Sequence, residues 1–104
     1  MALDLTETFG SAQPVIGMVH LPALPGAPGY DERAGREGIL ERALADARAL
    51  ADGGADGIVV ENYGDTPFYP EAVPKHVVAD MTCIAERISS AVDLPMGINV
   101  LRND

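Results

Sequence analysis

The sequence has no tryptophan, a single cysteine and no long apolar run. Cys83 cannot form an intramolecular disulfide, and a lone thiol is most stable in a reducing cytoplasm. Every apolar stretch is far shorter than the ~20 residues that a membrane span needs. Residues 1–13 lack the basic and apolar regions of a secretory signal. We therefore expect a soluble, cytoplasmic protein without membrane insertion, in which Cys83 is a small side chain on a helix flank.

Positive charge is also scarce. Seven Lys and Arg residues face sixteen Asp and Glu residues, which leaves a net charge of −9. Such a balance disfavours nucleic acid and anionic membranes as partners. An Asp-rich surface with one lysine, Lys75, is also typical of cytoplasmic proteins of halophiles.

Apolar segments with two different periods alternate along the chain. Short apolar runs predict strands at residues 15–21, 56–62 and 95–101, and helical spacing predicts helices at 37–52 and 76–92. Strands that alternate with helices form parallel sheets through right-handed crossovers. We expect both helices to pack on one side of this sheet.

Two folds fit this order, a doubly wound sheet and a (β/α)8 TIM barrel. A dinucleotide-binding sheet needs a G-x-G-x-x-G turn directly after its first strand. Here that place holds residues 21–36, a long connection rich in proline and glycine. The barrel is therefore the favoured fold class, with only its first three strands and two helices present.

Each predicted helix has one apolar stripe. The members of the first stripe are Ile39, Leu40, Ala43, Leu44, Ala47, Leu50 and Ala51, and Gly53 and Gly54 follow as a C-terminal cap. Those of the second are Val77, Met81, Ile84, Ala85, Ile88 and Val92, whereas Asp80, Glu86 and Arg87 are expected to face water.

Strand alternation predicts a polar site. Side chains alternate across a strand, so His20, Glu61 and Asn99 fall late on matching faces of the three strands. The opposite faces, which include Val15, Val19 and Ile98, are apolar and suit packing under helices. Groups at the carboxyl ends of barrel strands carry catalysis and binding. The alternative for each residue is a hydrogen-bonded structural role.

Further polar residues follow the strand ends. Asp65 is a third catalytic candidate, and the candidates for substrate binding are Asn62, Asn99, Arg102, Asn103 and Asp104. Arg102 suits a carboxylate or phosphate, or equally an ion pair with Glu61 or Asp104. The spacing matches no compact metal motif, so no metal is expected, and the residues indicate no particular cofactor. Three aromatic residues, Tyr63, Phe68 and Tyr69, suggest a pocket wall, a lid or a subunit contact.

Three segments resemble one family. "VIGMVHLPALPGAPGY", "GGADGIVVENYGDTPFY" and "GINVLRND" are similar to the BtpA/SgcQ family, whose members are barrels of the ribulose-phosphate-binding type. The resemblance matches residues His20, Pro22, Leu24, Pro25, Gly26, Glu61, Asn62, Gly64, Asp65, Pro67, Asn99, Leu101, Arg102, Asn103 and Asp104. The family is named for photosystem I biogenesis, and related members lie among sugar-metabolism genes.

Family members continue through five more βα units. The resemblance therefore implies that residues 1–104 are the N-terminal part of one barrel domain, with residues 1–13 as a lead-in. It implies a full-length parent that acts on a small sugar-like or phosphorylated metabolite, with Glu61 as the leading acid/base and His20 second. The alternative is a non-catalytic photosystem I assembly factor. We expect the isolated chain to be inactive and either partly unfolded or self-associated, and a homo-oligomer is an open possibility.

Overall fold

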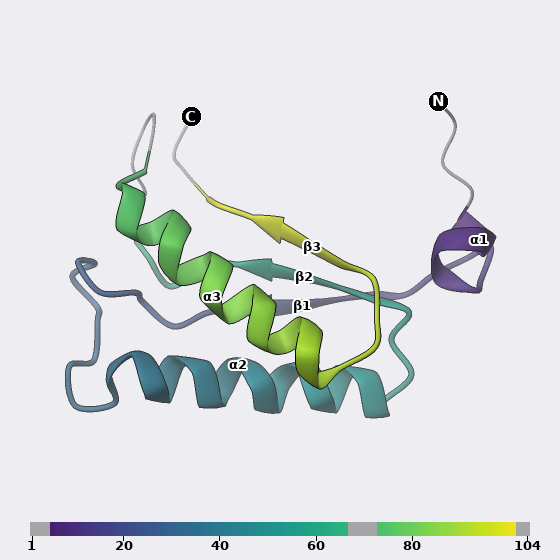
Figure 1. Ribbon diagram of the computed structural model, residues 1–104, viewed down its shortest axis with the longest axis horizontal. Coiled ribbons are helices and arrows are strands. Elements are labelled where there is room, and N and C mark those ends of the chain that lie inside the picture. The colour runs from purple at the N-terminus through teal and green to yellow at the C-terminus, as the bar shows by residue number, and fades with distance from the viewer. Residues whose placement is uncertain (1–4, 67–72, 102–104) are drawn as a thin grey trace.

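The computed structural model describes residues 5–66 and 73–101, which form an α/β unit with a parallel sheet (Figure 1). The elements in chain order are α1 (Leu5–Phe9), β1 (Ile16–His20), α2 (Gly35–Asp52), β2 (Gly57–Glu61), α3 (Lys75–Ala91) and β3 (Met96–Asn99). The strands lie in the order β1-β2-β3, and both pairs are parallel. The predicted strands and helices are confirmed, with bounds that differ by at most two residues.

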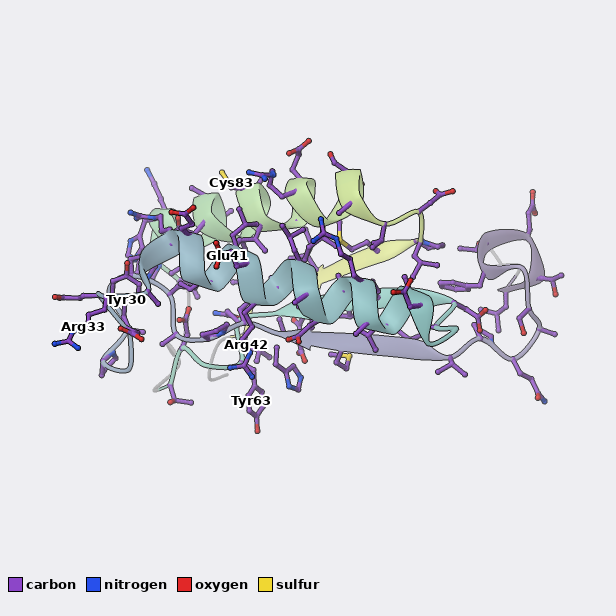
Figure 2. All side chains as sticks on the ribbon, turned by 90° about the horizontal axis from the view of Figure 1, so that it is seen from below. Tyr30, Arg33, Glu41, Arg42, Tyr63 and Cys83 are labelled. Atoms are coloured by element: carbon purple, nitrogen blue, oxygen red, sulfur yellow. The ribbon has the colours of Figure 1, made fainter. Side chains whose placement is uncertain are left out.

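Helices α2 and α3 lie together on one side of the strands (Figure 2). From the sheet, Val19, Ile58 and Val60 are almost completely buried in this layer. The buried residues of the helices are Ile39, Ala43, Ala47, Val77, Met81, Ile84, Ala85 and Ile88, which are members of the two predicted stripes. Removal of this apolar surface from water is the main force that holds the helices on the sheet.

The C-terminus of α2 shows why a glycine is needed at position 54. The N–H of Gly54 donates to Ala51 O, and the N–H of Ala55 donates to Leu50 O. These two bonds form a Schellman motif, whose left-handed residue is Gly54 with φ of 96°. A side chain is strained in that conformation, so glycine ends the helix here at the least cost.

The short helix α1 was not predicted, because its five residues are too few to show a helical period. It belongs to the segment expected to be only a lead-in. Its Phe9 ring lies against Gly57, where an added Cβ would be 2.8 Å from Phe9 Cε1. Helix α1 therefore packs at the N-terminal end of β2.

Three expectations about exposure were wrong. Asp80 does not face water: its side chain is 15% exposed and accepts a bond from Arg36 Nε at 2.9 Å. That hydrogen bond and the charge of Asp80 raise the pKa of Arg36 above its ordinary value. Val15 and Ile98 were expected under the helices but are 64% and 49% exposed. Val15 precedes β1, and Ile98 lies on an edge strand that α3 covers only in part.

The face of the sheet opposite α2 and α3 is open. Its apolar side chains Ile16 and Met18 are 39% and 42% exposed. Parallel strands with both helices on one face are compatible with a βαβαβ part of a barrel. In the part of the chain that the structure describes, no helix combines the length and apolar character needed to cross a membrane.

Candidate functional site

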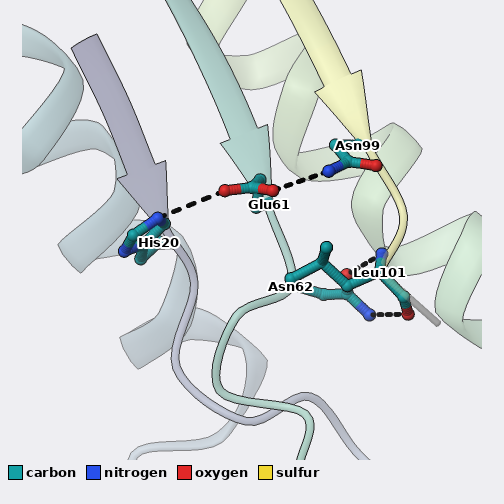
Figure 3. A network of polar contacts seen from close by, with 5 residues as sticks. All are labelled: His20, Glu61, Asn62, Asn99 and Leu101. Atoms are coloured by element: carbon teal, nitrogen blue, oxygen red, sulfur yellow. Dashed lines mark hydrogen bonds and ion pairs between the residues drawn. The ribbon is translucent and has the colours of Figure 1, made fainter. Parts of the chain in front are cut away.

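A row of polar side chains crosses the carboxyl ends of the three strands (Figure 3). In the strand register, His20 pairs with Glu61, and Glu61 pairs with Asn99. Residues that pair across parallel strands place their side chains on the same face, which is why the row forms. The structure thus brings together the three residues that strand alternation placed on matching faces.

Glu61 is the centre of this row. Its Oε1 lies 3.2 Å from His20 Nε2, and its Oε2 accepts a bond from Asn99 Nδ2 at 2.6 Å. The side chain of Glu61 is only 13% exposed, whereas that of His20 is 46% exposed. The carboxylate is therefore held from both sides, and the imidazole is the more accessible group.

Tyr63 covers one face of the His20 ring. The two ring centroids are 4.4 Å apart and the planes are inclined by 14°, which is a stacked arrangement. Tyr63 is 58% exposed and projects on the side of the sheet away from α2 and α3 (Figure 2). The prediction left its role open between a pocket wall, a lid and a subunit contact, and its observed contact is with the site.

Asn62 and Asp65 link the segments that follow the strands. Asn62 Oδ1 accepts the N–H of Leu101 at 2.5 Å, and Asn62 Nδ2 donates to Asp65 Oδ2 at 3.1 Å. Asp65 Oδ1 accepts the N–H of Leu24 at 2.6 Å. Asn62 is 1% and Asp65 8% exposed. Both oxygens of Asp65 accept hydrogen bonds inside the protein, so its observed contacts are structural. The catalytic role expected for Asp65 and the binding role expected for Asn62 stay predictions.

The connection after β1 packs directly on the segment after β2. Gly64 N donates to Leu21 O at 3.0 Å. A Cβ on Gly64 would lie 2.6 Å from Ala23 N and 2.8 Å from Leu21 O, so no side chain fits. His76 Nε2 holds the same connection through Pro25 O at 2.9 Å. Sequence reasoning missed these contacts, since no local pattern reports an approach between two loops.

The predicted binding residues Arg102, Asn103 and Asp104 lie outside the described residues, as do Phe68 and Tyr69. Within residues 5–66 and 73–101, no group of three or more His, Cys, Asp and Glu side chains is arranged to hold a metal ion. Cys83 is exposed, as expected for a helix flank.

A groove of about 450 Å³ lies elsewhere, between α2 and α3. Its lining is mainly apolar and includes Ile39, Leu40 and Ile84, with Asp80 and Arg36 among its polar members. This groove is the seam between two packed helices, on the side of the sheet away from the polar row. We favour the polar row as the site because acid, imidazole and amide groups converge there.

Comparison with known proteins gives consistent matches. Residues 11–104 match the family model described as BtpA family. The chain is 47% identical over 102 residues to "Photosystem I biogenesis protein BtpA" of Synechocystis sp.. It is 50% identical over 90 residues to an uncharacterized protein of Archaeoglobus fulgidus, and 35% identical over 97 residues to the sgc region protein SgcQ of Escherichia coli.

These matches cover most of this chain but little of the relatives. They span 98%, 86% and 93% of the chain, in the same order, and 35%, 35% and 36% of the relatives. The chain thus spans about a third of the length of the curated relatives that it matches. No solved structure matches it.

Proposed function

Because the chain belongs to the BtpA family, we propose that it is the N-terminal part of a TIM-barrel domain that acts on a small sugar-like or phosphorylated metabolite in the cytoplasm. The parallel sheet with both helices on one face supports this architecture. The length of the relatives supports a parent with additional βα units.

The observation that carries the proposal is the bonded row His20, Glu61 and Asn99 at the carboxyl ends of the strands. Carboxylate and imidazole groups in contact form a proton-transfer pair. In the proposed reaction, one group of the Glu61–His20 pair takes the proton while the other stabilises it, and Asn99 orients Glu61. Arg102, Asn103 and Asp104 remain proposed binding residues for the ligand.

The test uses the longest reading frame that contains this chain, incubated with sugars and sugar phosphates while product formation is followed by NMR. Glu61→Gln keeps the shape of the side chain but removes its charge, and we expect turnover to fall by about 10²- to 10⁴-fold. Glu86→Gln is the matched control, since Glu86 is exposed on α3 and bonds only to Ser90 among the described contacts. Unchanged turnover in Glu61→Gln contradicts the proposal.

A non-catalytic assembly role is the second candidate. One observation favours it: the Synechocystis relative at 47% identity is named for photosystem I biogenesis. In that case, the full-length protein would copurify with photosystem I subunits from a photosynthetic host, and Glu61→Gln would not change the yield. Loss of turnover in Glu61→Gln without any copurification supports the enzyme instead.

A further inference from the structure

We infer that the atom that accepts the proton in the proposed reaction is Nδ1 of His20, and that Glu61 and Tyr63 are positioning residues for the imidazole. The inference deepens the proposed function and rests on it for the meaning of the proton transfer. Three contacts among the described residues carry it. The Glu61 carboxylate lies at the edge of the His20 ring, the Tyr63 ring stacks on its face, and the Asn99 amide bonds to the other oxygen of Glu61.

The contact with Glu61 selects the tautomer of His20. An ionised carboxylate only accepts hydrogen bonds, so the bond at 3.2 Å requires that Nε2 carries the hydrogen. A neutral imidazole protonated at Nε2 has its lone pair on Nδ1. Among the described residues, no group bonds to Nδ1 of His20, which leaves this nitrogen available as a base.

Exposure separates the two candidates for the base. Both oxygens of Glu61 are already bonded, and its side chain is 13% exposed. The His20 side chain is 46% exposed. A ligand that approaches the open face of the sheet thus reaches the imidazole more readily than the carboxylate. The same carboxylate faces the cationic ring after the proton arrives, and opposite charges in contact favour that state.

Tyr63 restrains the plane of the ring. It lies two residues after Glu61, so one short segment contacts the His20 ring both at its edge and on its face. If the His20 ring turned by half a turn, a ring carbon would lie at the Glu61 carboxylate in place of Nε2. The stacked phenol favours the observed plane, and the bond to Glu61 favours the observed edge.

The proton balance is simple. A hydroxyl or acidic C–H of the ligand gives its proton to Nδ1, and the electron pair of the broken bond stays on the ligand. The imidazole becomes a cation whose Nε2–H still donates to Glu61. Asn99 keeps the carboxylate in place through Oε2. No redox partner is required.

The test is the tautomer of His20 in the protein encoded by the longest reading frame that contains this chain, measured by long-range ¹H–¹⁵N NMR above the pH at which imidazole is protonated. We expect only the Nε2–H form in buffer and both forms in urea. His76 is the internal control, because its Nε2 bonds to the carbonyl of Pro25, which can only accept. Glu61→Ala should restore the mixture at His20 and leave His76 unchanged.

A second pair of variants tests the aromatic contact. Tyr63→Phe retains a ring and should keep the ring-current shift of the His20 ring protons, whereas Tyr63→Leu should lose it. A protonated Nδ1 in the native chain overturns the inference, and so does a His20 spectrum identical in buffer and in urea. Because the tautomer is read without turnover, an inactive full-length protein counts against the proposed function alone.

Discussion

The side chain of Asn62 makes two contacts with the backbone of Leu101. Its Oδ1 accepts the N–H of Leu101 at 2.5 Å, and its Nδ2 lies 3.5 Å from the carbonyl oxygen of Leu101. The amide thus mimics a strand partner just beyond the last residue of β3. It also bonds to Asp65, whose other oxygen holds Leu24. One buried amide therefore couples the segments that follow all three strands.

We expect Asn62→Ala to lower the free energy of unfolding by about 2 to 4 kcal/mol, because it leaves the Leu101 N–H and one Asp65 oxygen without these partners. Urea unfolding followed by circular dichroism measures this change. Ser90→Ala, which removes exposed bonds to Glu86, is the control and should stay within about 0.5 kcal/mol. Equal effects of the two variants would argue against the coupling role of Asn62.

Gly64→Ala should cost about 3 kcal/mol, since its Cβ would lie 2.6 Å from Ala23 N, a backbone atom that cannot swing away. The matched control is Gly29→Ala, because its Cβ would lie 3.5 Å from Ala23 Cβ, an ordinary contact. The two variants differ by one methyl group each from the native chain. Thermal unfolding of both would show whether the loop contact is as close as described.

Two isoleucines on neighbouring strands differ in burial, so they test the effect of burial on stability for one residue type. Ile58 is 1% exposed and Ile98 is 49% exposed. We expect Ile58→Ala to cost about 2 to 5 kcal/mol and Ile98→Ala less than about 1 kcal/mol, both from urea unfolding. A large loss for Ile98→Ala would mean that the edge of the sheet is covered in solution.

Arg36→Ala should shift the urea midpoint further than Arg42→Ala. Removal of Arg36 takes away the partner of Asp80, whose Oδ2 is already buried without a hydrogen bond within the described structure. Arg42 and Asp46 form an exposed pair at 3.9 Å, and such pairs contribute little. The double variant Arg36→Ala/Asp80→Ala should recover part of the loss, and no recovery would contradict the assignment.

The open face predicts the behaviour of the isolated chain. With Ile16 and Met18 exposed, we expect it to be inactive and either partly unfolded or self-associated. Size-exclusion chromatography at rising concentration with hydrogen exchange measures both. Met18→Lys should lower the apparent mass, whereas Val78→Lys, at a residue 47% exposed on α3, should not. A compact monomer with protected amides in all three strands would contradict this expectation.

The sequence alone reveals the spacing of apolar residues along the helices and the alternation of side chains along the strands. Apolar spacing located α2 and α3 to within two residues but missed α1, and alternation placed His20, Glu61 and Asn99 on one face. These predictions succeed because backbone geometry repeats every 3.6 residues in a helix and every two in a strand. The hydrogen bonds that join His20, Glu61 and Asn99 were not predicted and are a result of the structure.

Contacts between distant loops have no such local signal. The bond of Asp65 to Leu24 and the stacking of Tyr63 on His20 each join residues about forty positions apart. The sequence singled out Asp65 and Tyr63 as candidate residues but did not indicate that they contact Leu24 and His20. The burial of Asp80 was missed for the same reason, because Arg36 lies on another helix.

The sheet order β1-β2-β3 follows the order of the chain, so each strand pairs with one that is already made when it emerges. Glu61 follows His20 by 41 residues, and Asn99 follows Glu61 by 38. At a synthesis rate of about 5 to 20 residues per second, roughly 2 to 8 s separate the addition of Glu61 from that of Asn99. The row is therefore completed in chain order, because the amide of Asn99 is the last of its three polar groups to be made.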